Sequence, residues 1–323
     1  MDLVFRQVGS DDVPAWLRLL AAAEAVDATG ECYDADDLLE ELRDPATGPD
    51  DRLGVFDGDR MVAFAGIRPR GVTTYRRIDA EGIVDPEERG QGLGTRLVEW
   101  VVDRCRVVQR REPPLVETRV RILGFLRNAG QVRLLEDHGF RQVSWSAVMR
   151  LALPTDDPPP VWPSGLSLRT YGRAWSAATM DAHNAAFAEH EGFMPWTAEM
   201  WEQWVDGTKN ARPELSWVVV DDADPATVVA YLQTNEFEAN AAARGRREAY
   251  LAKLGVRREY RGRGLGSALL AQASREYAAH GFEEASLDVD THNATGAFGL
   301  YERAGYRVES RTANFERVIP PGG

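Results

Sequence analysis

The chain has 323 residues, of which 44% are hydrophobic and 28% are charged, and its formal net charge is −13. These values are typical of a soluble globular protein with room for two domains of about 150 residues each. Binding to nucleic acid or to an anionic membrane rests on clustered Lys and Arg, so an acidic chain predicts neither partner.

Targeting segments and metal sites are also not indicated. No run approaches the roughly 18 to 20 apolar residues of a membrane span, and the start MDLVFRQVGSDDVP lacks the pattern of a signal peptide. We therefore expect a cytoplasmic protein. Cys32 and Cys105 are too few for a disulfide framework, and neither they nor the histidines have metal-ligand spacing, so we expect no metal.

The first half of the chain predicts alternating strands and helices. A short strand at Leu3–Val8 precedes a helical segment that carries Trp16–Ala25. A hairpin and a strand that runs into a glycine loop come next, and a helix follows at Arg96–Val108. The half ends with a strand, a short helix and a strand. The predicted strands of the hairpin and of this last part are Leu53–Phe56, Met61–Ile67, Leu115–Val120 and Phe140–Leu151.

A proline-rich segment interrupts this order. Five prolines between Pro154 and Pro163 prevent both a helix interior and a central strand. Residues 154–164 are therefore predicted to be a linker between domains.

The second half repeats the elements of the first. Arg89-Gly-Gln-Gly-Leu-Gly94 recurs as Arg261-Gly-Arg-Gly-Leu-Gly266, and Leu134-Leu-Glu-Asp-His-Gly-Phe140 recurs as Leu300-Tyr-Glu-Arg-Ala-Gly-Tyr306. Self-similarity in the same order predicts a duplication. We expect two domains, 1–153 and 165–323, each an α/β (α+β) domain with a mixed sheet.

The loop Arg257–Gly264 has the chemistry of an anion site, because it lies between a predicted strand and a predicted helix. Glycines let the backbone approach a ligand, and a helix N-terminus offers unpaired amides to a phosphate. Arg261 and Arg263 are expected to add charge-assisted bonds. The loop is not a dinucleotide fingerprint, since Ser267 replaces its third glycine, and no Gly-Lys-Ser/Thr of a P-loop follows.

The constellation Arg261-x-x-Gly264-x-Gly266, followed by Asn293 and Leu300-Tyr301-x-x-x-Gly305-Tyr306, resembles the GNAT superfamily of N-acetyltransferases. The resemblance implies tandem GNAT-like domains with mostly antiparallel sheets flanked by helices, and acetyl-CoA as co-substrate. In the C-terminal half the implied acetyl-CoA-binding residues are Leu254, Gly255, Val256, Arg261, Gly262, Arg263, Gly264, Leu265, Gly266, Ser267 and Asn293. In the N-terminal half they are Val84, Arg89, Gly90, Gly92, Gly94 and Thr95. The tandem halves and the segment His183–His190 resemble, more narrowly, mycothiol synthase and its actinobacterial relatives.

Tyr301 is the predicted general acid, because a phenol can protonate the CoA thiolate as it leaves. The alternative is a core tyrosine on an amphipathic helix. Glu248 is the candidate base for the amine proton, with a water chain near Glu236 and Glu238 as an alternative; each also fits a solvated strand or loop residue. Leu135 replaces Tyr301 in the first half, which is therefore predicted to be catalytically silent.

The expected reaction is acetyl transfer to a primary amine of a small molecule by direct attack, because no Ser or Cys nucleophile with a base is visible. Two alternatives stay open: a mycothiol synthase proper, acting on an aminoacyl pseudodisaccharide, and a non-catalytic CoA-binding protein. We expect a monomer or a homodimer. Aromatic residues before the second hairpin either line the acceptor cleft or pack as a core face. They are Phe187, Phe193, Trp196, Trp201 and Trp204.

Overall fold

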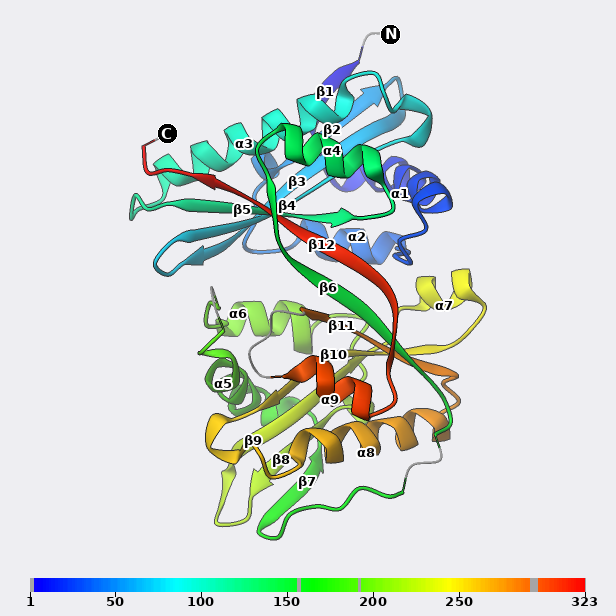
Figure 1. Cartoon of the computed structure of the whole chain (residues 1–323), viewed down its shortest axis with the longest axis vertical. Helices are drawn as coiled ribbons and strands as arrows, with labels where there is room; N and C mark the ends of the chain where they lie inside the picture. Colours follow the sequence, from blue (N-terminus) through cyan, green and yellow to red (C-terminus); the bar gives the residue numbers. More distant parts are fainter. Residues whose placement is uncertain (1–2, 156–157, 191–192, 291–295, 323) are drawn as a thin grey trace. The chain divides into compact units, whose positions relative to one another are not determined.

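The computed structural model describes residues 3–155, 158–190, 193–290 and 296–322 (Figure 1). Contacts divide the chain into an N-terminal unit, Met1–Trp145 with Arg311–Gly323, and a C-terminal unit, Ser146–Ser310. This division differs from the expected domains 1–153 and 165–323 at the last strand of each half. The described residues of the predicted linker, 154–155 and 158–164, form no helix or strand.

The N-terminal unit is a six-stranded sheet in the order β1-β2-β3-β4-β5-β12. All neighbours for which a register is known are antiparallel except β4 and β5, which are parallel. The strands are β1 Val4–Gln7, β2 Arg52–Asp57, β3 Arg60–Val72, β4 Arg76–Val84, β5 Thr118–Phe125 and β12 Arg307–Ile319. The helices are α1 Val13–Asp27, α2 Ala35–Leu42, α3 Leu93–Arg111 and α4 Ala129–Asp137.

Two apolar clusters hold helices to the two faces of this sheet. Trp16 and Leu19 of α1 pack with Phe64 of β3, whereas the buried face of α3 packs with the intervening residues of β3. Because side chains alternate along a strand, one strand supplies both clusters. The helices thus cover both faces of the sheet, as Figure 1 shows for α1 and α3.

The C-terminal unit repeats this architecture with the strand order β7-β8-β9-β10-β11-β6. Its one parallel pair of known register is β10 with β11. The strands are β6 Arg141–Ala152, β7 Leu166–Thr170, β8 Trp217–Asp221, β9 Asp224–Asn235, β10 Glu248–Val256 and β11 Glu284–Asp290. The helices are α5 Ser176–Phe187, α6 Ala198–Trp201, α7 Glu238–Arg244, α8 Leu265–Ala279 and α9 Ala297–Arg303. The predicted mixed, mostly antiparallel sheets flanked by helices are confirmed in both halves.

The last strand of each half of the sequence belongs to the sheet of the other unit. Residues 312–319 of β12 pair with β5 of the N-terminal unit, and residues 146–152 of β6 pair with β11 of the C-terminal unit. Phe315 and Ile319 are consequently buried in the N-terminal core. This exchange of last strands is the reason why the units differ from the domains expected from the repeat.

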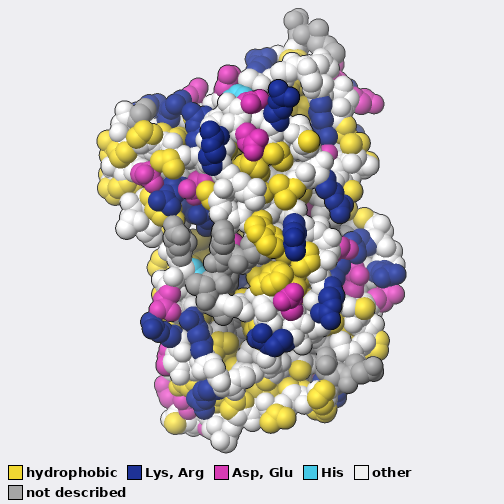
Figure 2. All heavy atoms as spheres, in the orientation of Figure 1, with side chains coloured by type: hydrophobic (Ala, Val, Ile, Leu, Met, Phe, Trp, Pro, Cys, Tyr) yellow, Lys and Arg dark blue, Asp and Glu magenta, His cyan; other side chains and the backbone are white. Residues whose placement is uncertain are grey.

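The surface and the helices bear on two expected partners. On the face shown in Figure 2, Lys and Arg side chains are interspersed with Asp and Glu in each unit. None of the described helices combines the length and the apolar character that a membrane crossing requires. The expectations about nucleic acid, membrane and cellular location stay predictions.

The exchange predicts where a mutation near the C-terminus acts. Phe315 is 1% exposed, so Phe315→Ala should cost about 3 to 5 kcal/mol through lost burial and a cavity. We expect hydrogen exchange to show lost protection in β3 and β5 of the N-terminal unit, with β8 and β9 retained. Val318→Ala, at a side chain that is 48% exposed on the same strand, is the control and should change little. Loss of protection in β8 and β9 first would contradict this assignment.

Candidate functional site

The parallel strand pair in each unit comes apart partway along its length. In the N-terminal unit the pairing of β4 with β5 ends at Ala80 and Ile122, although β4 continues to Val84 beside β3. In the C-terminal unit the pairing of β10 with β11 ends at Tyr250 and Ser286, and β10 continues to Val256 beside β9. The outer end of β4 and of β10 therefore has one backbone edge outside these ladders, which can pair with an extended ligand.

A glycine loop follows each of these strands. Gly90 and Gly92 have φ of +77° and +84°, and Gly262 and Gly264 have φ of +75° and +83°. This left-handed conformation is strained for residues with a side chain. The loops lead directly into the N-termini of α3 and α8, which begin at Leu93 and Leu265. The structure therefore places unpaired first-turn amides beside both open strand edges, as an anion site requires.

The third glycine of each loop lets two helices approach closely. A Cβ atom at Gly94 would lie 2.8 Å from Leu134 Cδ2 of α4, and one at Gly266 would lie 3.0 Å from Leu300 Cδ2 of α9. Both distances are shorter than or at the limit of ordinary carbon contacts. Glycine at these positions thus sets how near α4 and α9 come to the anion loop.

Arg89 and Arg261 occupy the same place in the two copies of the repeat. Both side chains form contacts within the protein that the sequence did not predict. Arg261 donates from Nε to the Val256 carbonyl at 3.2 Å and from its terminal nitrogen to the Ala186 carbonyl at 2.6 Å, and it pairs with Glu189 at 3.3 Å. Its guanidinium is thus used within the protein, tying the strand end to the end of α5. Arg263 is exposed, with its guanidinium 5.4 Å from the Tyr260 ring centroid, so it remains available to an anion.

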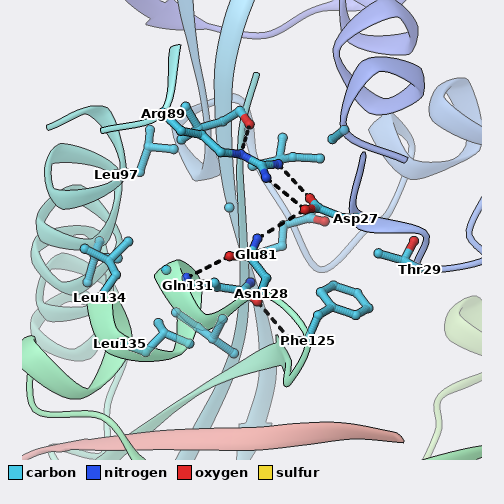
Figure 3. Close-up of a pocket in the computed structure, with 18 of the residues that line it drawn as sticks. Asp27, Thr29, Glu81, Arg89, Leu97, Phe125, Asn128, Gln131, Leu134 and Leu135 are labelled. Atoms are coloured by element: carbon cyan, nitrogen blue, oxygen red, sulfur yellow. Dashed lines mark hydrogen bonds and ion pairs between the residues drawn. The ribbon is translucent and has the colours of Figure 1, made fainter. Parts of the chain in front are cut away.

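Arg89 makes the matching connection in the N-terminal unit (Figure 3). It donates to the Val84 carbonyl at 3.1 Å and to both carboxylate oxygens of Asp27 at 2.8 and 2.6 Å. Asp27 is the last residue of α1, so this bidentate pair fixes the helix end beside the loop. In both units the repeated Arg thus ties the strand end to the end of a helix, and its expected contact with acetyl-CoA stays a prediction.

The N-terminal unit contains a cavity of about 910 Å³ between these elements. It is enclosed by α1, the ends of β4 and β5, the glycine loop and α4. Every N-terminal residue expected to bind acetyl-CoA lines it: Val84, Arg89, Gly90, Gly92, Gly94 and Thr95. The cavity also reaches Leu135, which is 2% exposed and belongs to the apolar core. An elongated ligand with an anionic end fits this combination of loop and strand edge.

In the C-terminal unit the same region holds a phenol. Tyr301 lies on α9, is 8% exposed, and its ring centroid is 6.0 Å from that of Tyr306. Burial raises the pKa of Tyr301 to about 12, and the proximity of Tyr301 helps to raise the pKa of Tyr231. The Tyr231 ring occupies the space beside Gly255, where a Cβ would lie 2.4 Å from it. Tyr301 is therefore close enough to Tyr231 for their hydroxyl groups to interact electrostatically.

The remaining predicted residues of this unit are placed as follows. Leu254, Gly255 and Val256 form the outer end of β10, and Gly262 to Ser267 form the loop and the first turn of α8. Asn293 lies outside the described residues. Within the part of the chain that the structure describes, no group of three His, Cys, Asp or Glu side chains is arranged to hold a metal.

The three candidate bases are engaged in ion pairs. Glu248 lies 2.6 Å from Arg150 and accepts a hydrogen bond from the Ser286 hydroxyl. Glu236 lies 2.6 Å from Arg247 and 2.9 Å from Arg212. Although burial opposes it, hydrogen bonds from Arg247 and Arg212 hold the pKa of Glu236 below its usual value, which makes this carboxylate a weaker proton acceptor. The contacts therefore favour a structural role for Glu248 and Glu236.

Glu238, the third carboxylate, has an 83% exposed side chain 3.9 Å from Arg212. It gives no sign of a fixed position from which it could accept a substrate proton.

Sequence reasoning missed a polar pair inside the aromatic cluster of the C-terminal unit. His183 Nδ1 lies 2.5 Å from the Tyr231 hydroxyl, and burial lowers the pKa of His183 to about 3. Lys253 of β10 lies with Nζ 4.7 Å from the Trp196 ring centroid, and burial lowers its pKa to about 8. This cluster contains a neutral imidazole and an amine, features that apolar patterning alone does not reveal.

The predicted aromatic residues divide between core and cluster. Trp201 is 1% exposed and belongs to the core, whereas Phe187 and Trp196 pack on His183 with ring centroids 4.7 and 5.1 Å away. Phe193 joins them at 5.7 Å from His183. Trp204 is partly buried. These contacts support the packing interpretation, and the lining of an acceptor cleft stays a prediction.

Comparison with known proteins matches both halves to one group. Residues 176–306 match the acetyltransferase (GNAT) family, and residues 49–142 match a GNAT acetyltransferase domain. The mycothiol acetyltransferase of Thermobispora bispora is 30% identical over 79% of this chain and 79% of its own length. That of a Parafrankia species is 27% identical over 95% of both chains.

Two solved structures share the fold over almost the whole chain. A GCN5-related N-acetyltransferase from Sphaerobacter thermophilus has a TM-score of 0.75 and 29% identity, covering 99% of this chain and 97% of its own. A tandem GNAT protein from the clavulanic acid biosynthesis pathway has a TM-score of 0.73 at 18% identity, over all of both chains. The second likeness concerns the fold alone.

The cavity of the N-terminal unit predicts a pH-dependent stability. The cavity walls restrict hydration of Glu81 and, with the Glu41 carboxylate nearby, raise the pKa of Glu81 from 4.5 to about 7. Since the unfolded chain loses this proton first, the Glu81 carboxylate lowers stability progressively between about pH 4.5 and 7, and fully above pH 7. Glu81→Gln should therefore raise Tm above pH 7 and have little effect near pH 4.

The control is Glu136→Gln, which makes the same charge change at an exposed residue outside the cavity. Thermal unfolding from pH 4 to 8 should show a much smaller pH-dependent difference for it. A Tm difference between Glu81→Gln and wild type that does not vary with pH would contradict the raised pKa.

Proposed function

Because the chain belongs to the GNAT family of acetyltransferases, we propose that its C-terminal unit transfers the acetyl group of acetyl-CoA to a primary amine of a small molecule. Membership of the family makes the chain an acyl-CoA-dependent N-acetyltransferase that uses acetyl-CoA. The observation that supports the choice of unit is a single difference between matching helices. Tyr301 of α9 carries a buried phenol, whereas the matching residue of α4 is Leu135.

The proposed binding of acetyl-CoA follows from the open edge and the loop. The pantetheine arm pairs with the backbone of Leu254 to Val256, as an added strand would. The pyrophosphate lies on the first-turn amides of α8 between Gly262 and Ser267, and Arg263 supplies a positive charge. This arrangement directs the thioester toward the inner end of β10, where its pairing with β11 ends.

The proposed reaction is direct attack. The amine nitrogen forms a bond to the thioester carbonyl carbon, and the carbon–sulfur bond then breaks as the tetrahedral intermediate collapses. Tyr301 donates its proton to the departing sulfur, so that CoA leaves as the thiol. The pKa of about 12 keeps this phenol protonated at neutral pH. The amine loses one proton, and because Glu248 and Glu236 are ion-paired, we assign that proton to a water chain.

The acceptor of the related proteins suggests a narrower version of this proposal. Relatives with 27 to 30% identity to this chain are named mycothiol acetyltransferases. An aminoacyl pseudodisaccharide is therefore the second candidate acceptor. A non-catalytic CoA-binding protein is the less favoured reading, because it leaves the phenol on α9 without a role.

The proposed reaction predicts the effect of removing the general acid. Tyr301→Phe keeps the ring and its packing but removes the proton donor, so kcat should fall by about 10²-fold or more with little change in acetyl-CoA affinity. Thiol release measures kcat, and calorimetry measures affinity. Tyr306→Phe, a matched change at a fully buried neighbour, should retain turnover. Undiminished kcat in the Tyr301 variant would mean that water protonates the thiolate.

The proposal also predicts different effects of the same substitution in the two glycine loops. Gly264 and Gly92 have φ of +83° and +84°, and a Cβ at either position would meet no atom within 4 Å. Valine there would strain the loop backbone without a clash. We expect Gly264→Val to remove most turnover, and Gly92→Val to retain turnover while lowering CoA binding to the N-terminal unit.

Calorimetric stoichiometry and thiol release together measure both effects, and circular dichroism verifies folding. The opposite result, with turnover lost in the Gly92 variant and kept in the Gly264 variant, would place the chemistry in the N-terminal unit.

A further inference from the structure

Glu81 occupies a distinctive place in the N-terminal cavity. It is the first residue of β4 beyond the pairing with β5, which ends at Ala80. Its side chain lines the cavity between the ends of α1 and α4 (Figure 3), where it remains accessible to solvent although the cavity walls restrict its hydration. Gly66 on the neighbouring strand leaves room for the carboxylate, because a Cβ there would lie 3.1 Å from Glu81 Oε1.

The other carboxylates of the cavity are already used within the protein. Asp27 forms the bidentate pair with Arg89. Glu24 accepts hydrogen bonds from the Thr29 amide at 2.9 Å and the Gly30 amide at 2.8 Å. Glu31 accepts one from the Tyr33 hydroxyl at 3.0 Å, and Asp137 lies 3.8 Å from Arg133. Within the described residues, the side chain of Glu81 forms neither a hydrogen bond nor an ion pair, so its carboxylate is available to a ligand.

The charged groups around Glu81 leave it with a negative environment. The Glu41 and Glu31 carboxylates face it and raise its pKa, and Arg68 and Arg52 lower it. These arginines are committed elsewhere, because Arg68 is paired with Asp44 at 2.5 Å and with Glu41. Arg52 donates to the Glu41 carbonyl at 2.6 Å. Together with restricted hydration, these neighbours hold the pKa of Glu81 near 7.

The matching position of the other unit has the opposite charge. Counted from the repeated Arg, Glu81 precedes Arg89 by the same interval at which Lys253 precedes Arg261. An ammonium group that is attracted by Glu81 would be repelled by Lys253. The cavity is therefore not a copy of the acceptor site, and it selects its own ligand.

We propose that the N-terminal cavity is a binding site for a small organic cation, whose primary ammonium group pairs with the Glu81 carboxylate. Leu135 supplies no proton, so the cation is held and not acetylated. Binding of the cation does not depend on turnover by the C-terminal unit. Binding requires the carboxylate and so strengthens as pH rises through 7.

Thermal unfolding of the full-length chain tests this, with spermidine, agmatine and phenethylamine as probes at millimolar concentration. A ligand that binds only the folded state raises Tm. We expect at least one of these cations to raise the Tm of the wild type by a few degrees at pH 8 and by less at pH 6. Glu81→Gln should lose this rise, whereas the control Glu136→Gln should keep it.

2-Phenylethanol, the neutral analogue of phenethylamine, separates charge pairing from simple filling of an apolar cavity. The proposal is overturned if it raises Tm as much as phenethylamine does. It is also overturned if no cation raises the Tm of the wild type, or if the rise is equal in Glu81→Gln. The comparison of pH 6 with pH 8 in the wild type decides the matter even if the Glu81 variant folds poorly.

Discussion

The separation of one parallel strand pair in each unit is the constraint on which both sites depend. A backbone edge that leaves a sheet must find other partners, because unpaired amides and carbonyls are costly when buried. The open ends of β4 and β10 therefore define where an extended ligand can bind. Each glycine loop turns the chain from that edge into a helix N-terminus, and Arg89 and Arg261 fix the turn by bonding the carbonyls of Val84 and Val256. Strand edge, loop and helix end together form the site that we propose for acetyl-CoA.

The two copies keep this device and differ in the side chains that face it. Tyr301 and Leu135 occupy matching places on α9 and α4, so that only one copy has the phenol that we propose as the proton donor. Glu81 and Lys253 occupy matching places on β4 and β10. The charge at this place, near the proposed position of the thioester, is therefore opposite in the two copies. Such changes leave the backbone intact, because the residues that require special backbone conformations are glycines present in both copies. Duplication thus allows the chemistry to diverge while the scaffold stays the same.

Local patterns in the sequence were sufficient for the fold of each half and for the glycine loops, since these depend on periodicity and on positive φ. They were insufficient for contacts between distant residues. Glu248 was a candidate base, yet Arg150, about a hundred residues earlier, lies 2.6 Å from its carboxylate. Arg261 was expected to bind phosphate. The sequence did not reveal that its side chain donates hydrogen bonds to the carbonyls of Val256 and Ala186. Glu81 was overlooked because its lack of a partner is a property of the folded cavity; comparison with Lys253 in the repeat was the available signal.

The exchanged last strands give a physical reason for keeping a half without the catalytic phenol. The core of the N-terminal unit needs Ala313, Phe315 and Ile319, which follow α9 along the chain, and the sheet of the C-terminal unit needs residues 146–152. Neither sheet is complete when the chain is divided at the proline-rich segment. Moreover, few residues separate Tyr301 from the part of β12 that pairs with β5. The helix that carries the proposed proton donor is therefore followed directly by a strand that pairs in the N-terminal unit. The N-terminal unit thus contributes to the stability of the chain whether or not it turns over substrate.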